Sequence, residues 1–243
     1  MTHGLWFFSV SRHRLWEALG RAEGRPLGPL EMVLSPWWMM MLVWCKFLVT
    51  WRFFRLWALA DGMDVPENLT RCLCANYDIV GFWKNWHASY NLWLVRYMYI
   101  PMGGATWRLL NVWPIFTFVA LWHDVEPQML SWAWLMALII APEAAGKWVG
   151  AQPWCIRDKS GRAFRYAAAA AAAVNMVFLI TVNLVGFAFG PEGIRPLLYQ
   201  VLGTPAFLPY VMLAVFSGIQ LTLALRDARE HAAAAALRLE GKM

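Results

Sequence analysis

Long hydrophobic runs separated by short polar segments make up most of the chain. The runs occupy residues 30–60, 106–123, 128–149, 174–189 and 206–225. An α-helix needs about 20 apolar residues to cross a bilayer, and lipid-exposed backbone must satisfy its own hydrogen bonds. The pattern therefore predicts an all-α, polytopic helical membrane protein with about five spanning helices. An alanine run at 167–173 leads into the fourth helix and would allow another helix to pack closely.

The polar segments divide the chain into three predicted parts. Residues 1–29 form a basic N-terminal approach segment, residues 30–225 the membrane domain, and residues 226–243 a charged, alanine-rich helical tail. The loop at 150–165 and the tail are both rich in cations and are separated by two crossings. The positive-inside rule places both in the cytoplasm and the cation-free turn at 123–127 on the opposite side.

One stretch, Gly81 to Gly104, departs from this pattern. It crowds aromatic, cationic and amide side chains together and ends in Pro101-Met-Gly-Gly104, which should stop a helix. Polar side chains are costly in hydrocarbon unless they are paired or wetted, so we expect a tilted, interfacial or re-entrant helix that handles a polar group. We place this stretch near the start of the 106–123 helix, with His87 and His123 toward opposite ends of one path through half the membrane.

Composition agrees with a membrane protein and excludes several other classes. Of 243 residues, 60% are hydrophobic and 15% are charged, and the 17 tryptophans suit aromatic belts at the membrane surface. The net charge of +6 comes from short clusters beside the apolar runs, which is typical of topology signals and anionic lipid contacts. We therefore expect membrane lipids, and no nucleic acid, as partners.

The four cysteines lack zinc or redox spacing, and no Gly-rich phosphate loop or G-x-S-x-G elbow is present. The sequence thus argues against a metal site, an ATP-driven transporter and a serine hydrolase, and it predicts no bound cofactor.

His123 is the most distinctive candidate for chemistry. It ends an apolar run in the sequence Ala-Leu-Trp-His-Asp, where an ionisable side chain indicates a functional site because burying it is costly. A neutral imidazole could take a proton from a hydroxyl that attacks a thioester. The alternative is a histidine that extends to the interface beside Asp124, and the residues alone leave both interpretations open.

Further candidates lie in the central stretch. His87 could act with His123 or merely contact lipid headgroups. Asn85 and Asn91 could donate hydrogen bonds to a carbonyl or oxyanion, or else satisfy backbone at a helix end. Lys84 and Arg96 could bind phosphates or serve as ordinary interfacial cations.

The quoted residues resemble a known family. Gly81-Phe-Trp-Lys-Asn-Trp-His87, then Trp93 through Gly104, then an apolar helix ending in Leu121-Trp-His123-Asp, is similar to the signature of the membrane-bound O-acyltransferase (MBOAT) superfamily. The segment before it, with Pro66-Glu-Asn68, resembles the glycerol-uptake branch related to Hedgehog acyltransferase. That branch is associated with remodelling glycosylphosphatidylinositol (GPI) anchors in the endoplasmic reticulum.

The resemblance implies a multi-pass enzyme that uses acyl-CoA as co-substrate and acylates a lipid hydroxyl, such as that of a lyso-GPI or lyso-phospholipid. It assigns His123 as the base and His87 as its polar partner, where other branches use Asn or Asp, and it makes Trp86 a further substrate contact. A non-catalytic or transporter-like relative and a protein acyltransferase remain alternatives; the chain keeps both histidines, one of which non-enzymes often lose. Family members carry more spanning helices before residue 30, so we expect a C-terminal part of a longer protein.

Overall fold

The computed structural model describes residues 29–155, 158 and 161–240. Within these ranges the regular structure is helical, apart from one isolated antiparallel bridge between Leu69 and Trp86, and the predicted all-α class is confirmed. The predicted basic segment 1–29 lies outside the described residues except for Pro29. The helices are α2 (Pro29–Ala60), α3 (Ile79–Asn85), α4 (Ala88–Leu94), α5 (Arg108–His123), α6 (Pro127–Ala151), α7 (Arg162–Leu184), α8 (Gly190–Gly203) and α9 (Phe207–Glu240), with short turns η1 (Leu73–Ala75), η2 (Val95–Tyr99), η3 (Gly104–Trp107) and η4 (Val185–Phe189).

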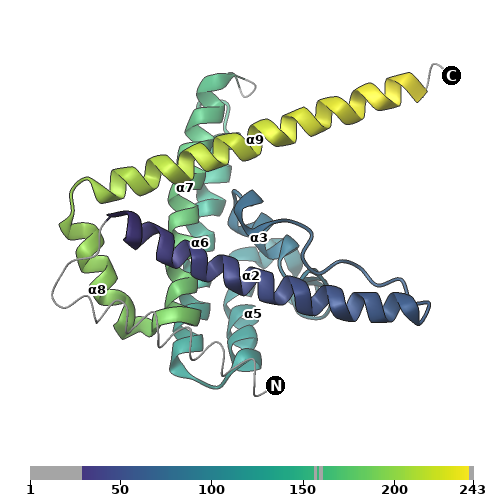
Figure 1. The fold of residues 1–243 in the computed structure, drawn as a ribbon, viewed down its shortest axis with the longest axis horizontal. Helices are drawn as coiled ribbons and strands as arrows, with labels where there is room; N and C mark the ends of the chain where they lie inside the picture. The colour runs from purple at the N-terminus through teal and green to yellow at the C-terminus, as the bar shows by residue number, and fades with distance from the viewer. Residues whose placement is uncertain (1–28, 156–157, 159–160, 241–243) are drawn as a thin grey trace.

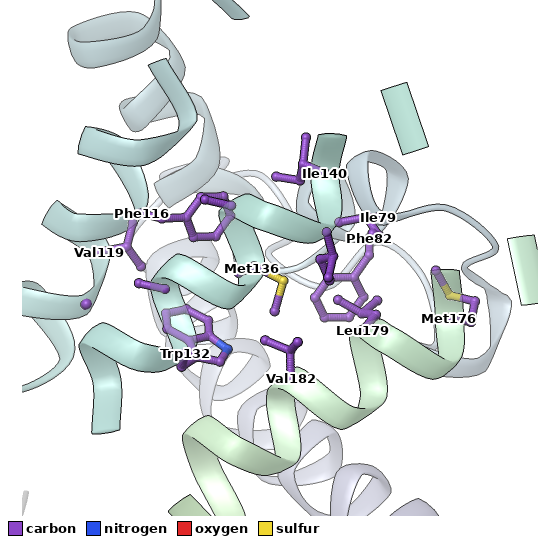
Figure 2. Packing of buried hydrophobic residues seen from close by; sticks show 14 of the residues in the cluster. Ile79, Phe82, Phe116, Val119, Trp132, Met136, Ile140, Met176, Leu179 and Val182 are labelled. Carbon is purple, nitrogen blue, oxygen red and sulfur yellow. The ribbon is translucent and has the colours of Figure 1, made fainter. Parts of the chain in front are cut away.

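Three helices, α5, α6 and α7, stand side by side and form the centre of the molecule (Figure 1). The inward face of α6 presents Trp132, Met136 and Ile140 at intervals of four residues, which is the spacing of one helical face. These side chains pack against the buried faces of α5, α7 and α3 (Figure 2). The labelled partners are Ile79, Phe82, Phe116, Val119, Met176, Leu179 and Val182. This cluster fixes α3 against the central helices.

Three described helices are long and apolar enough to cross a membrane, at Pro127–Ala151, Arg162–Phe187 and Phe207–Ala234. They correspond to the predicted runs at 128–149, 174–189 and 206–225. The helix predicted at 106–123 forms as α5, but its 16 residues are shorter than the ~20 that a perpendicular crossing requires. The structure thus provides three of the predicted spans among the described residues, with α5 beside them.

The first and last described helices run across the central three (Figure 1). α2 is 32 residues long, and its second half carries Lys46, Arg52 and Arg55, of which Arg52 pairs with Glu67. α9 crosses α7 and continues without a break from the apolar run into the charged residues after 225. The segment predicted as a separate tail is therefore the extension of a spanning helix.

The central stretch forms a broken helix. α3 ends at Asn85, α4 begins at Ala88, and α4 continues through η2 to Tyr99. The predicted stop at Pro101-Met-Gly-Gly104 is confirmed, because Gly103 and Gly104 adopt φ of 94° and 56°, where L side chains are disfavoured. The amide of buried Asn111 then donates to the Gly104 carbonyl and holds this turn against α5.

Candidate functional site

A large, mainly apolar cavity of about 1850 Å³ lies among α2, the broken helix, the central helices, α8 and α9. One face of α2 lines it through Met40, Phe47 and Trp51, which recur at helical spacing. Its described lining contains no Asp or Glu, whereas four cations reach it. They are Lys46, Lys84, Arg108 and Lys147, of which Lys147 forms ion pairs with Glu143 and Asp78. The cavity therefore combines apolar walls with positive charge, which suits an amphipathic anion.

His123 lies at this cavity as the last residue of α5. Its ring meets Trp122, Trp132 and Phe187 edge-on, at centroid distances of 4.9, 5.8 and 5.6 Å. The side chain remains exposed although aromatic rings surround it. An imidazole in such a place is oriented by packing and still accessible to a ligand.

His87 lies at the break between α3 and α4 and also lines the cavity. Its φ of 46° makes it the one described non-glycine residue in the left-handed region. The ring is stacked between Trp51 at 4.5 Å and Tyr90 at 5.1 Å. Burial lowers the pKa of His87 below its ordinary value, so the imidazole is neutral at pH 7.

The two histidines lie close together, with Trp122 between them. The Trp122 ring is 6.1 Å from His87 and 4.9 Å from His123. The prediction that they lie toward opposite ends of a path is therefore wrong. The segment after His87 runs antiparallel to α5, as the stacking of Tyr90 on Trp122 and of Trp93 on Phe118 shows, and this brings His87 to the C-terminal end of α5.

The short segment around Asn68, which precedes the central stretch, supports the break at His87. Asn68 accepts hydrogen bonds from the Ser89 N–H at 3.0 Å and the Ser89 hydroxyl at 2.7 Å, and its carbonyl accepts from the Ala88 N–H at 3.0 Å. The bridge from Leu69 to Trp86 lies beside these bonds. Asn68 was quoted only as part of a family resemblance; no local pattern indicated that it caps α4 from a distance.

The remaining candidates separate into two groups. Trp86, Asn91 and Lys84 line the cavity, and the side chain of Asn91 has no hydrogen-bond partner among the described residues. Asn85 and Arg96 do not line it. The Asn85 amide donates to the Gly81 carbonyl at 2.6 Å and accepts from the Thr70 hydroxyl, so both of its ends are engaged in holding the end of α3.

The described residues contain no group of three or more His, Cys, Asp or Glu side chains arranged to hold a metal ion. The described cysteines are unpaired, and Cys74 alone of the four reaches the cavity.

Comparison with known proteins shows which family the chain is similar to. A model of the membrane-bound O-acyltransferase family matches residues 28–182, a range that contains both histidines and helices α2 to α7 up to Val182. Membrane-bound O-acyltransferase gup1 of Schizosaccharomyces pombe is 39% identical over 236 residues, covering 95% of this chain and 38% of that protein. Membrane-bound O-acyltransferase GUP1 of Millerozyma farinosa is 35% identical over 239 residues, covering 95% of this chain and 44% of that protein.

A more distant relative is protein-cysteine N-palmitoyltransferase HHAT of Mus musculus, 30% identical over 149 residues, which cover 58% of this chain and 30% of that protein. The chain spans less than half the length of each of these relatives. The family model that matches residues 28–182 and the identity to these relatives lead to one conclusion: the chain belongs to the membrane-bound O-acyltransferase family.

Proposed function

We propose that this protein transfers a fatty acyl group from acyl-CoA to a hydroxyl group of a membrane lipid, with His123 as general base. The observation that carries the proposal is that His87 and His123 line one apolar cavity with a single tryptophan between their rings. A fatty acyl chain needs such apolar walls, and the cations at the cavity suit the phosphates of coenzyme A.

In the proposed reaction, His123 takes the proton of the acceptor hydroxyl as its oxygen attacks the thioester carbonyl carbon. A carbon–oxygen bond forms and the carbon–sulfur bond breaks, which gives an ester and the thiolate of coenzyme A. The imidazolium then returns its proton to the sulfur. The exposed position of His123 among aromatic rings allows this direct contact with substrate.

Neighbouring residues have supporting roles in the proposal. Neutral His87 and the free amide of Asn91 supply hydrogen bonds to the carbonyl oxygen, where negative charge develops. Lys84 binds a phosphate of the donor, and Trp86 packs on the substrate. Asn85 and Arg96 have no substrate role, because neither reaches the cavity.

The names of the relatives bear on the identity of the acyl acceptor. The two yeast relatives are named as O-acyltransferases and cover nearly the whole chain, which supports a hydroxyl acceptor. Together with the resemblance to the GPI-remodelling branch, this favours a lyso-GPI or a lyso-phospholipid in the endoplasmic reticulum. The mouse relative's name supports a protein acceptor as the second candidate.

The proposal is tested in membranes that contain the complete protein, with labelled acyl-CoA and lyso-GPI, lyso-phospholipid or a peptide as acceptor. We expect His123→Ala to lower lipid acylation by at least about 10²-fold, the usual contribution of a general base. His231→Ala is the matched control, since His231 is exposed on α9 and does not line the cavity. Undiminished turnover in His123→Ala would remove this histidine from the mechanism, and turnover with the peptide alone would favour the second candidate.

A further inference from the structure

Glu143 is a buried carboxylate in the middle of a spanning helix. It follows Pro142 in α6, and its side chain is only 3% exposed. Ionisable groups at such positions are costly unless they are fully paired, and they commonly serve function. The reaction proposed above does not use Glu143, so the burial of this carboxylate needs another explanation.

The Glu143 carboxylate is bonded to another element as well as to its own helix. One oxygen accepts a hydrogen bond from the Ile79 N–H at 2.6 Å, and the other lies 3.5 Å from the Val80 nitrogen. Lys147, one turn along α6, donates to Glu143 at 2.6 Å and also lies 3.3 Å from Asp78. Backbone N–H groups in the first turn of α3 have no partner within the helix. Glu143 therefore caps this turn together with Asp78, whose carboxylate accepts from the Gly81 N–H at 2.5 Å.

The core packing of Ile79 and Phe82 holds the middle of α3, and hydrogen bonds hold its two ends. Asn85 and the bridge at Trp86 hold the C-terminal end, and His87 follows immediately in its left-handed conformation. Glu143 and the N-cap residue Asp78 hold the N-terminal end. A displacement at Ile79 would thus be carried along two turns of helix to the imidazole of His87.

We propose that Glu143 is a positioning residue: its carboxylate fixes the first turn of α3 and thereby sets the place of His87 beside His123. This inference rests on the proposed function for its catalytic consequence. The claim that Glu143 fixes the first turn of α3 does not depend on the proposed function and can be tested without measuring activity.

The proposal differs from an ion pair that only stabilises α6. If Glu143 only stabilised α6, its ion pair with Lys147 would account for its whole effect. Removal of another ion pair at the same end of the bundle would then lower activity to a similar extent. Asp227 offers the comparison, because it pairs with Arg165 at 2.5 Å and joins α9 to α7. Its second partner is Arg226 on α9, at 3.7 Å, which donates to the Tyr77 hydroxyl and not to Glu143 or Ile79. Asp227→Ala therefore removes an interhelical ion pair and leaves the cap of α3 intact.

The experiment compares wild type, Glu143→Ala, Glu143→Gln and Asp227→Ala in the complete protein in lipid nanodiscs. Acylation kinetics are measured together with hydrogen–deuterium exchange of peptides that contain residues 78–89. We expect Glu143→Ala to lower kcat by about 10²-fold with KM changed less than about threefold, since a misplaced catalytic group affects the reaction more than binding. Exchange in residues 78–89 should rise in that variant.

The two other variants separate positioning from general stability. Glu143→Gln keeps an oxygen that can accept the Ile79 N–H, so it should retain at least about a tenth of wild-type kcat. Asp227→Ala should keep wild-type kcat and wild-type exchange in residues 78–89. Unchanged exchange in Glu143→Ala, or the same loss of kcat in Asp227→Ala, would overturn the proposal. If wild type acylates no acceptor, the proposed function fails, and the exchange data still decide whether Glu143 holds α3.

Discussion

His87 adopts a backbone conformation that few residue types tolerate. Its φ of 46° and ψ of 53° lie in the left-handed region, where Asn, Asp and His are several times more frequent than other non-glycine residues. A histidine therefore suits the backbone at the break between α3 and α4, whatever the role of its imidazole.

The conformation of His87 can be tested separately from its chemistry. Both His87→Asn and His87→Val remove the imidazole, but β-branched Val strongly disfavours positive φ. We expect the Val variant to be less stable than the Asn variant by about 1–2 kcal/mol, the cost of a left-handed residue. Thermal unfolding in nanodiscs, followed by tryptophan fluorescence, measures this difference. Equal stability of the two variants would show that residue 87 is not left-handed in the membrane.

Individual residues could be identified from the sequence only where their own surroundings were unusual. His123 was recognisable because an ionisable group ends an apolar run, and the structure places it at a cavity. The hydrogen bond from Thr70 to Asn85 could not be predicted from the sequence. The two residues are 15 positions apart, and a bridge of one residue pair, Leu69 and Trp86, brings them together. Glu143 lies within the predicted hydrophobic run at 128–149, and its hydrogen bond from Ile79, 64 positions earlier, could not be predicted from the neighbouring residues.

At the level of elements, the existence of the helices followed from the sequence, but their direction did not. The stop at Gly103 and Gly104 was predicted from residue types, whereas the antiparallel course of the preceding segment along α5 was not. Hydrophobic runs define which segments are helical, and the side on which a broken helix packs depends on contacts such as Tyr90 with Trp122. Because this antiparallel course was not predicted, the two histidines were expected far apart, whereas the structure places them close together.

The turn η4 packs against α6 at a position where only glycine fits. A Cβ added to Gly186 would lie 2.5 Å from Cδ1 of Trp132, a side chain that is 1% exposed and therefore cannot move aside. Gln128 also donates to the Gly186 carbonyl at 2.6 Å and holds the two elements together.

We expect Gly186→Ala to destabilise the protein by about 1–3 kcal/mol through overpacking. It should also lower activity, because Trp132 and Phe187 both contact the His123 ring. Gly218→Ala is the control, since a Cβ at Gly218 on α9 meets no atom within 4 Å. Thermal unfolding of both variants measures the effect. An unfolding temperature for Gly186→Ala equal to that of Gly218→Ala would contradict this close packing.

The cavity is a property of the whole molecule. Its walls come from residues as far apart as Trp37 and Ile219, so no local stretch of sequence could predict it. Apolar faces on α2, α5 and α7 were each compatible with lipid or with a neighbouring helix, and only the three-dimensional arrangement shows which parts face a common hollow. The sequence predicted the class of fold and a candidate histidine, and packing determines which side chains line the cavity.

The orientation of this cavity across the membrane is decided by α6, which joins the turn at 123–127 to the cation-rich loop at 150–165. If α6 spans, the two segments lie on opposite sides, and the positive-inside rule places the loop in the cytoplasm. His123 then lies at the non-cytoplasmic end of the cavity, so a cytoplasmic acyl-CoA must reach it through the cavity.

Val125 and Trp154, which are 81% and 68% exposed, allow a direct test of this orientation. With the native cysteines of the complete protein replaced by serine, an impermeant maleimide should label Trp154→Cys in sealed microsomes and Val125→Cys only after permeabilisation. Labelling of Val125→Cys in sealed vesicles would reverse the orientation and allow cytoplasmic acyl-CoA direct access to His123.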